Sequence, residues 1–360
     1  MSSKIAVISI INLKHSSLLN IYTDYLIEEG IDYDIIYYDR YGIVENSSAE
    51  KIYKYSNPFH NNMNPLQKVY HYYKFRGFVA KILKENSYNQ LIIWNSFTAY
   101  LVADIVLRKY RGKYILNIRD YGFEKFKLVY SLMNILIKKS KLTTYSSPGF
   151  LEFLPYDNNQ DKLLFINSYK NLEIEPKKTF KKNKPINIGF IGNVRFINND
   201  IKLLNVFKND SRFMVSFYGT NSEILQEYCE NNDIFNVNFE GPFPVEKTEF
   251  HLNNIDVMNN LYGYGSVALD TAVSIKYYHA LTKAIPILVY EGTYMEKFCT
   301  NKFVVQRNYD ESFKDELFNW YTNLKVDQLN ENAKTHLLNI KNENDQALKR
   351  IHSSIKKDMK

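Results

Sequence analysis

The sequence predicts an α/β protein built from two doubly wound parallel sheets, that is, two Rossmann-like domains that face each other across a cleft. Short apolar runs alternate with amphipathic segments in both halves of the chain, which is typical of a parallel sheet covered by helices on both faces. A charged stretch interrupts this alternation near the middle. The length of 360 residues is enough for two domains of about 150 residues each.

The first half contains six apolar runs that predict buried strands, over residues 4–11, 34–38, 91–94, 114–118, 142–145 and 163–166. Helices are expected over residues 16–29, 64–86, 96–109 and 124–137, and a further helix is expected to begin at residue 147. Ser16 and Ser147 are typical helix caps, Pro65 suits a first helical turn, and Gly30 suits a helix end.

A lysine-rich segment separates the two halves. Residues 177–185 read Lys-Lys-Thr-Phe-Lys-Lys-Asn-Lys-Pro, with no apolar period, which indicates a linker. The predicted organisation is an N-terminal Rossmann-like domain, a linker, a C-terminal Rossmann-like domain and a helical segment that packs back on the first domain, over residues 1–168, 169–185, 186–330 and 331–360.

The second half restarts the alternation. Strands are expected over residues 186–191, 213–218, 237–239, 255–258, 287–290 and 303–305. Helices are expected over residues 222–230, 245–253 and 274–283, followed by a helical pattern to the C-terminus. In the first of these helices, Ile224, Leu225 and Tyr228 are expected to share the apolar face.

The composition excludes several classes of protein. Apolar residues make up 45% and aromatic residues 15% of the chain, which is too much for a disordered protein. Two cysteines, Cys229 and Cys299, are too few for a disulfide framework and lack metal-ligand spacing, so a reducing cytoplasm is expected. No signal peptide is expected at the start, and residues 128–137, the longest apolar helical stretch, are shorter than the roughly 20 residues of a membrane span.

The net charge of +7 is unevenly distributed. Residues 1–185 hold 27 Lys and Arg against 17 Asp and Glu, whereas residues 186–360 hold 19 against 22. A basic, tyrosine-rich first half suits an anionic membrane, an anionic acceptor or nucleic acid, and it is equally explained by a solvated lysine surface. No nucleic-acid-binding motif accompanies the charge, so no nucleic-acid partner is expected.

Five motifs of the second half occur in a specific order. They read Ile-Gly-Phe-Ile-Gly-Asn-Val-Arg, Val-Ser-Phe-Tyr-Gly-Thr, Val-Asn-Phe-Glu-Gly-Pro-Phe, Ile-Asp-Val-Met, and Ser-Ile-Lys-Tyr-Tyr-His-Ala-Leu ahead of Ala-Ile-Pro-Ile-Leu-Val, over residues 188–195, 215–220, 237–243, 255–258 and 274–289. This order resembles the C-terminal, nucleotide-sugar domain of GT-B glycosyltransferases, and within them the bacterial polysaccharide enzymes of glycosyltransferase family four. The close resemblance covers about 105 residues, and the remaining chain is similar only in layout.

The resemblance implies an activity. It implies transfer of a sugar from a nucleotide diphosphate sugar, a UDP-sugar, to a glycan or lipid-linked glycan in bacterial surface polysaccharide synthesis, with retention of configuration. No Asp-x-Asp metal motif ends a strand, so no metal is expected, and no cofactor beside the nucleotide sugar. The alternatives are a nucleotide-sugar 2-epimerase on the same fold, for which no set of carboxylates is found, and a non-catalytic GT-B-like partner protein. A dinucleotide dehydrogenase is disfavoured because neither half has a Gly-x-Gly-x-x-Gly turn.

Three groups of residues are candidates for binding the donor diphosphate. Gly192 and Asn193 let the backbone approach a phosphate, and Arg195 suits a bidentate grip. Ser274 and Lys276 stand at a predicted helix start, where free N–H groups attract anions. The simpler interpretations are a surface arginine, a plain helix cap and an exposed lysine.

Further donor candidates come from the resemblance. Tyr218, Gly219, Thr220 and Phe243 correspond to loops that flank the base and ribose, although Tyr218 could simply end a strand and Phe243 staple a helix start. His279 stands where the family has the second of two glutamates, and a neutral imidazole can replace it on ribose hydroxyls or simply pack in the core.

The sequence also departs from the family. The first glutamate is absent, because Asp270 and Thr271 occupy its place, and the glycine-rich first loop is replaced by residues 11–16.

Two residues of the first half are candidates for the acceptor side. His15 follows the first strand, where inverting GT-B enzymes place a histidine general base, although the simpler interpretation is a loop histidine without a role. Asp120 ends the fourth strand run, and it could instead pair with Arg119 or cap a helix. The helix over residues 64–86 is rich in lysine and tyrosine, which suits peripheral binding to an anionic membrane surface. A cytoplasmic protein is expected, with or without such binding.

Overall fold

The computed structural model describes residues 4–16, 18–58, 63–157, 159–169, 175–176 and 184–356. The chain divides into two compact units. Unit 1 comprises Met1–Lys170 and Glu343–Lys360, and unit 2 comprises Asn171–Asn342. Most of the predicted linker, residues 170–174 and 177–183, lies outside the described residues.

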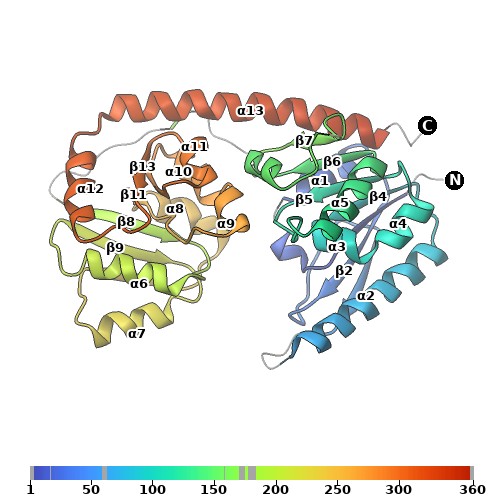
Figure 1. Ribbon diagram of the computed structural model, residues 1–360, viewed down its shortest axis with the longest axis horizontal. Coiled ribbons are helices and arrows are strands. Elements are labelled where there is room, and N and C mark those ends of the chain that lie inside the picture. Colours follow the sequence, from blue (N-terminus) through green and yellow to red (C-terminus); the bar gives the residue numbers. More distant parts are fainter. Residues whose placement is uncertain are drawn as a thin grey trace. The chain divides into compact units, whose positions relative to one another are not determined.

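Unit 1 is built on a seven-stranded parallel sheet of order β3-β2-β1-β4-β5-β6-β7 (Figure 1). Its strands are β1 (Ile5–Ser9), β2 (Tyr33–Asp39), β3 (Lys51–Ser56), β4 (Gln90–Trp94), β5 (Tyr114–Ile118), β6 (Leu142–Tyr145) and β7 (Leu163–Phe165). Its helical elements before the linker are η1 (Leu13–His15), α1 (Asn20–Glu28), α2 (Pro65–Glu85), α3 (Ser96–Leu101), α4 (Ala103–Lys109), α5 (Lys127–Lys139) and η2 (Pro148–Glu152).

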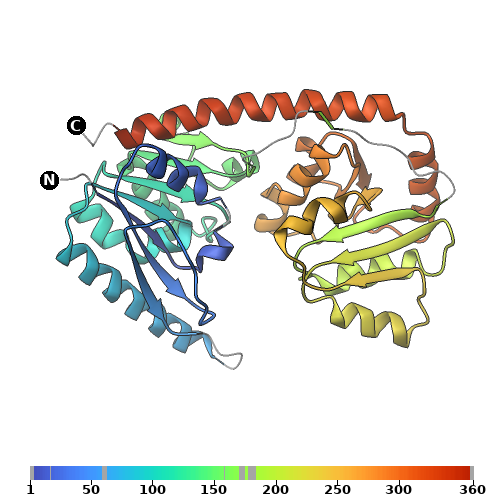
Figure 2. The same ribbon diagram turned by 180° about the vertical axis from the view of Figure 1, so that it is seen from behind.

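The central strand β1 is buried throughout, and Val7 pairs with Ile35 on one side and with Ile92 on the other. Helix α1 packs on one face of the sheet, in the same apolar cluster as Ile351 and Ile355 from the end of the chain. Helix α2 packs on the other face, where Phe75 stacks on Tyr38 at 5.5 Å. The views from both sides show the sheet covered on each face (Figures 1 and 2), as a parallel sheet requires.

Unit 2 is built on a six-stranded parallel sheet of order β10-β9-β8-β11-β12-β13. Its strands are β8 (Ile186–Ile191), β9 (Phe213–Tyr218), β10 (Val237–Glu240), β11 (Val257–Met258), β12 (Ile287–Tyr290) and β13 (Lys302–Val305). Its helical elements are α6 (Ile197–Val206), α7 (Glu223–Asn231), η3 (Val245–Lys247), α8 (Thr248–Leu252), α9 (Val267–Thr271), α10 (Ile275–Thr282), α11 (Tyr294–Phe298) and α12 (Ser312–Thr322). Helices α6, α7 and α12 share one apolar cluster with the sheet, and α8 and α10 lie on the opposite face (Figure 2).

Helix α13 (Val326–Lys356) contributes to both units, since residues up to 342 belong to unit 2 and later residues belong to unit 1. Ala347, Ile351 and Ile355 recur at helical spacing and enter the core of unit 1. Asn344 fixes this part of the helix, because its Nδ2 donates to the carbonyl oxygens of Asn167 and Tyr169. The helix therefore supplies apolar surface that covers one face of the first sheet.

The fold class predicted from the sequence is confirmed, and several element boundaries are corrected. Strand β3 was missed because it is an edge strand whose side chains alternate between exposed and half-buried, so no apolar run marks it. Ser16 does not cap the first helix, which begins at Asn20; its Oγ donates instead to the Asn12 carbonyl oxygen. The helix over residues 96–109 is broken at Val102.

Two further corrections concern helix faces and starts. The helix predicted from residue 124 begins at Lys127, because Glu124 is buried and bound to Tyr100 and Gly122. Of the three residues predicted to face the core from α7, Leu225 is buried and Tyr228 is half-buried against the same cluster, whereas Ile224 is exposed; Cys229 is the other buried residue of this helix. The predicted cap role of Ser147 is confirmed, since it accepts a hydrogen bond from the Gly149 N–H. The predicted start of α2 is also confirmed, with Asn64 in a capping box ahead of Pro65.

The role of α13 in unit 1 gives a stability prediction. Ile351 is fully buried, so Ile351→Ala should lower the free energy of unfolding of unit 1 by about 2–5 kcal/mol. Lys349→Ala, an exposed change on the same helix, should alter it by less than about 0.5 kcal/mol. The free energy of unfolding of unit 1 is measured by urea unfolding followed by the fluorescence of Trp94. The chain has 2 tryptophans, so Trp320 of unit 2 is replaced by Phe in all variants. Equal losses in both variants would contradict the packing role.

Candidate functional site

The candidate site lies at the switch point of the second sheet. Strands β8 and β11 are neighbours, but the chain continues from β8 towards β9 and from β11 towards β12. The connections after β8 and β11 therefore leave in opposite directions, and in open α/β sheets the crevice at such a point, at the carboxyl ends of the strands, is where ligands bind. The β8–α6 loop, the loop after β11 and the first turn of α10 supply most of the residues discussed below.

Two glycines bring the loops after β8 and β9 into backbone contact. Gly192 and Gly219 have φ of +121° and +138°, values that other residues rarely adopt. A Cβ on Gly219 would stand 1.9 Å from the Gly192 carbonyl oxygen, whereas a Cβ on Gly192 would meet nothing within 4 Å. The Gly192 backbone thus borders open space, as expected for a surface that a ligand approaches.

Asn193 and Thr220 reinforce the same loop pair. The Asn193 Oδ1 accepts hydrogen bonds from Thr220 Oγ1 at 3.1 Å and from Asn221 Nδ2 at 2.7 Å. The Val194 N–H donates to the Thr220 carbonyl oxygen at 3.0 Å. The side chains of Asn193 and Thr220 are therefore engaged in holding the loops together, and the loop backbone is the part that is offered to a ligand.

Lys276 is a half-buried cation between two aromatic rings. Its Nζ lies 4.2 Å from the centre of the Phe190 ring and 4.7 Å from the centre of the Tyr262 ring. Burial lowers the pKa of Lys276 to about 8; the charge of Arg195 acts in the same direction, and Asp200 opposes it. A lysine held in this way presents a desolvated positive charge, which interacts more strongly with an anion than an exposed lysine does.

Ser274, Arg195 and His279 surround this lysine. Ser274 is the N-cap of α10, since its Oγ accepts a hydrogen bond from the Lys276 N–H at 3.3 Å, and its hydroxyl also bonds to the Tyr262 phenol. Arg195 is exposed on the β8–α6 loop. Its charge adds to the burial that lowers the pKa of Lys276 and opposes the burial that raises the pKa of Tyr262. His279 lies one turn after Lys276, and burial together with the Lys276 charge lowers its pKa, so the imidazole is neutral near pH 7.

Asp200 belongs to the same group and was missed in the sequence. It stands in the first turn of α6, and only 2% of its surface is exposed. Its Oδ1 accepts a hydrogen bond from Asn259 Nδ2 at 3.4 Å, and its Oδ2 has no hydrogen-bond partner among the described residues. Burial raises the pKa of Asp200 to about 7, against the opposing effect of Lys276. The apolar period of Ile197, Ile201 and Leu204 could have revealed α6 and placed Asp200 at its start.

Tyr218 and Phe243 form a second group, around His251. The Tyr218 and Phe243 rings lie 4.7 Å and 4.2 Å from the ring of His251, which is fully buried. Tyr218 is itself buried and bonds through its hydroxyl to Asn187 Nδ2. Phe243 is half-buried, so it is the ring of the two with more surface for stacking on a base.

The acceptor candidates lie at the carboxyl edge of the first sheet. His15 is exposed at the end of η1, with its ring 5.1 Å from that of Tyr41, and Asp120 is exposed directly after β5. Their strands, β1 and β5, flank β4. The Arg119 guanidinium donates to Ser168 Oγ at 2.9 Å and lies over the Trp94 ring.

Two buried or capping carboxylates of this edge were missed in the sequence. The Glu45 carboxylate accepts from the N–H groups of Leu13 at 3.1 Å and Lys14 at 2.7 Å, so the start of η1 is capped from within the chain. Glu124 is buried and accepts from the Tyr100 hydroxyl, and burial raises the pKa of its carboxyl.

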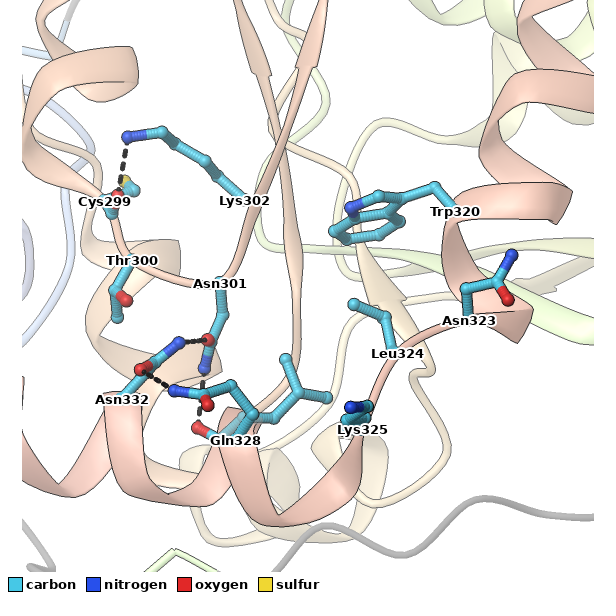
Figure 3. Close-up of a pocket in the computed structure, with 11 residues that line it drawn as sticks. Cys299, Thr300, Asn301, Lys302, Trp320, Asn323, Leu324, Lys325, Gln328 and Asn332 are labelled. Atoms are coloured by element: carbon cyan, nitrogen blue, oxygen red, sulfur yellow. Dashed lines mark hydrogen bonds between the residues drawn. The ribbon is translucent and has the colours of Figure 1, made fainter.

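A separate hollow of about 490 Å³ lies in unit 2 (Figure 3). Trp320 and Leu324 line one side, and the amides of Asn301, Gln328 and Asn332 line the other, where they bond to one another or to the backbone. Because Asn301 precedes β13, this hollow lies at the amino edge of the sheet, away from the switch-point crevice. Among the described residues, no three His, Cys, Asp or Glu side chains gather into a metal-binding group.

No protein-family model and no curated protein matches the sequence. Solved structures are similar over the whole chain. Sucrose-phosphate synthase from Thermosynechococcus elongatus is 10% identical with a TM-score of 0.75, covering 99% of each chain. Anabaena HepE in complex with UDP is 9% identical with a TM-score of 0.68, covering 98% of this chain and 100% of that one. Acinetobacter baumannii MurG is 10% identical with a TM-score of 0.56, covering 99% of each chain. This likeness confirms the GT-B fold.

Proposed function

We propose that the protein is a GT-B glycosyltransferase that transfers a sugar from a nucleotide diphosphate sugar, a UDP-sugar, to a glycan or lipid-linked glycan acceptor. The observation that carries the proposal is the convergence of Arg195, Lys276 and the Ser274-capped start of α10 at the switch point of the second sheet. Two cationic side chains beside a helix N-terminus suit a diphosphate. HepE, a structural neighbour, is described in complexes with UDP and with UDP-glucose.

The charges suggest how the leaving group is stabilised. As the bond between the sugar and the diphosphate breaks, negative charge develops on the phosphate oxygen. Arg195, Lys276 and the N–H groups at the start of α10 are fixed positive groups that stabilise this charge without a metal ion. The reaction we propose uses the nucleotide sugar as co-substrate and no separate cofactor.

The acceptor is proposed to meet unit 1 at the carboxyl edge of its sheet, where His15 and Asp120 are exposed. The resemblance to family four favours retention of configuration, in which the departing phosphate accepts the proton of the acceptor hydroxyl. In that case His15 assists acceptor binding more than proton transfer. A role in surface polysaccharide synthesis at the inner face of the membrane belongs to the same proposal.

The first prediction concerns the donor. Arg195→Ala and Lys276→Ala should each weaken binding of UDP-glucose by about 1–3 kcal/mol, the size of a lost charge-assisted hydrogen bond. Lys208→Ala removes an exposed lysine of the same unit and should leave the affinity unchanged. Isothermal titration calorimetry measures all three, and wild-type affinity in both site variants would remove the diphosphate from this loop pair.

The second prediction concerns catalysis. Loss of a general base reduces turnover by about 10²–10⁴-fold. Because the departing phosphate takes the proton in the proposed mechanism, Asp120→Asn should reduce turnover by less than this while donor affinity is kept. His15→Ala should have a smaller effect under the retaining mechanism, and Asp32→Asn, an exposed change in the same unit, should have none. Turnover on a matched donor and acceptor is compared with the anomeric configuration of the product, read by NMR. An inverted product together with an inactive His15→Ala enzyme would overturn the retaining mechanism.

The third prediction concerns the membrane. On α2, the apolar side chains of Leu66, Val69, Tyr70 and Tyr73 are exposed beside Lys68 and Lys74, whereas Phe75 packs inward and Arg76 pairs with Asp104. No described helix is long and apolar enough to cross a bilayer. An exposed basic and aromatic face suits an anionic surface instead.

Flotation with vesicles of phosphatidylcholine, with and without phosphatidylglycerol, tests this face. We expect binding that requires the anionic lipid and weakens in salt, and a Tyr70→Ser, Tyr73→Ser, Lys74→Gln variant should lose most of it. A Lys341→Gln, Lys349→Gln variant carries changes on exposed positions of α13 and should float like the wild type. Binding that is equal on neutral vesicles would contradict the electrostatic part of the proposal.

A further inference from the structure

A buried carboxylate stands inside a site that is otherwise positive. The groups proposed to hold the diphosphate are cationic, yet Asp200 lies close enough to Lys276 for each to shift the pKa of the other. Burying a carboxylate costs free energy unless it is paired and fully hydrogen-bonded. Asp200 receives one long hydrogen bond, from Asn259, and no ion pair within 4.0 Å joins it to Lys276 among the described residues. The position is costly for the fold and calls for a functional explanation.

The groups around Asp200 leave few other partners for its charge. Lys276 of α10 is the cation whose charge acts on Asp200. Arg195 of the β8–α6 loop and His279, one turn further along α10, interact electrostatically with Lys276. Tyr290 of β12 and Tyr309 after β13 lie within range of its charge, and the pKa of each phenol is raised, first by burial. Lys202 of α6 instead lies over the Tyr309 ring, at 3.9 Å. Lys276 is therefore the cation on which the ionised form of Asp200 depends.

A bound diphosphate would compete for that cation. Its negative charge next to Lys276 would offset the attraction that keeps Asp200 ionised and would repel the carboxylate directly. A carboxyl that already titrates near neutral pH responds to such a change by binding a proton. The unpartnered Oδ2 is the atom that would carry it, since Oδ1 accepts from Asn259.

We propose that Asp200 takes up one proton from solvent when the diphosphate of a nucleotide-sugar donor binds beside Lys276, and that it releases this proton when the nucleotide leaves. The inference rests on the proposed function and deepens it, because it makes donor affinity depend on pH through a residue that does not touch the donor. In the empty site the charge of Asp200 partly offsets that of Lys276, and in the occupied site the protonated carboxyl leaves the whole charge of Lys276 to the diphosphate. Asp200 is thus a positioning residue for Lys276.

The sign of the pH effect follows from linkage. Binding that takes up a proton weakens as the pH rises, because protons and donor stabilise the same state. Between about pH 6.5 and pH 8 the affinity of the wild type should fall roughly fivefold. Lys276 also titrates near this range, so the comparison is made in a Lys276→Arg background. There, Asp200→Asn, which is permanently neutral and of the same shape, should hold the affinity near its low-pH value over this range.

Calorimetry with UDP-glucose provides the test, because this donor has no group that titrates in the same range. Because Lys276, with a pKa of about 8, can itself take up protons when an anion binds, the proton count is compared in a Lys276→Arg background. Titrations at about pH 7.5 in two buffers of different ionisation enthalpy should give roughly 0.5–1 proton with Asp200 present and close to zero with Asp200→Asn. His279→Gln should keep the wild-type uptake. Lys276→Arg keeps its positive charge at all these pH values, so it should keep the uptake as well.

The outcomes separate the two proposals. Failure of UDP-glucose to bind the wild type would overturn the proposed donor and this inference with it. Binding without proton uptake in the Lys276→Arg enzyme, equal uptake in the Lys276→Arg, Asp200→Asn variant, or loss of the uptake in His279→Gln would overturn the inference alone. Folding of the variant is checked in the same samples: the pKa of Asp200 is raised by burial, so its ionisation destabilises unit 2 above about pH 7, and Asp200→Asn should melt at or above the wild-type temperature at pH 8.

Discussion

Both sheets consist only of parallel strand pairs, and this constraint shapes most of the molecule. A parallel sheet exposes two apolar faces, so each must be covered by helices on both sides, and every connection must cross over the sheet. Helices α1 and α2 lie on opposite faces of the first sheet, and the last turns of α13 complete the face on which α1 lies. The same crossovers return all the strand-to-helix loops to one edge of each sheet, and this is where the candidate residues gather.

In unit 2, the reversal of strand order between β8 and β11 turns that edge into a binding site. The glycine contact joins the loops after β8 and β9 at this edge, and Ser274 caps the start of α10. Lys276 reaches this point with its ammonium over Phe190 and Tyr262, which hold it in place without neutralising it. The rings keep the cation available to an anion, whereas a direct ion pair would have consumed it.

The local charge of this site differs in sign from the net charge of the half of the chain that contains it. Residues 186–360 carry more acidic than basic side chains, yet their candidate site collects Arg195 and Lys276 with a helix N-terminus. Asp200, an acidic group beside Lys276, is buried, and burial raises its pKa to about 7, which is the basis for the proposed change of its charge on donor binding. At the first sheet, by contrast, the start of η1 is capped by Glu45, and this helix end offers no comparable anion site.

The sequence by itself determined the fold class, most strands and the loops that carry Arg195, Ser274 and Lys276, because apolar periodicity, glycine and proline are local signals. It did not reveal β3, whose edge position removes the apolar run, or Asp200 and Glu124, whose burial depends on neighbours far away in the chain. Tertiary structure alone decided that Tyr218 and Phe243 pack around His251, while Lys276 packs between Phe190 and Tyr262. The reason is physical: periodicity reports which face of an element is apolar, whereas the charge and accessibility of a side chain depend on the groups that the fold places around it.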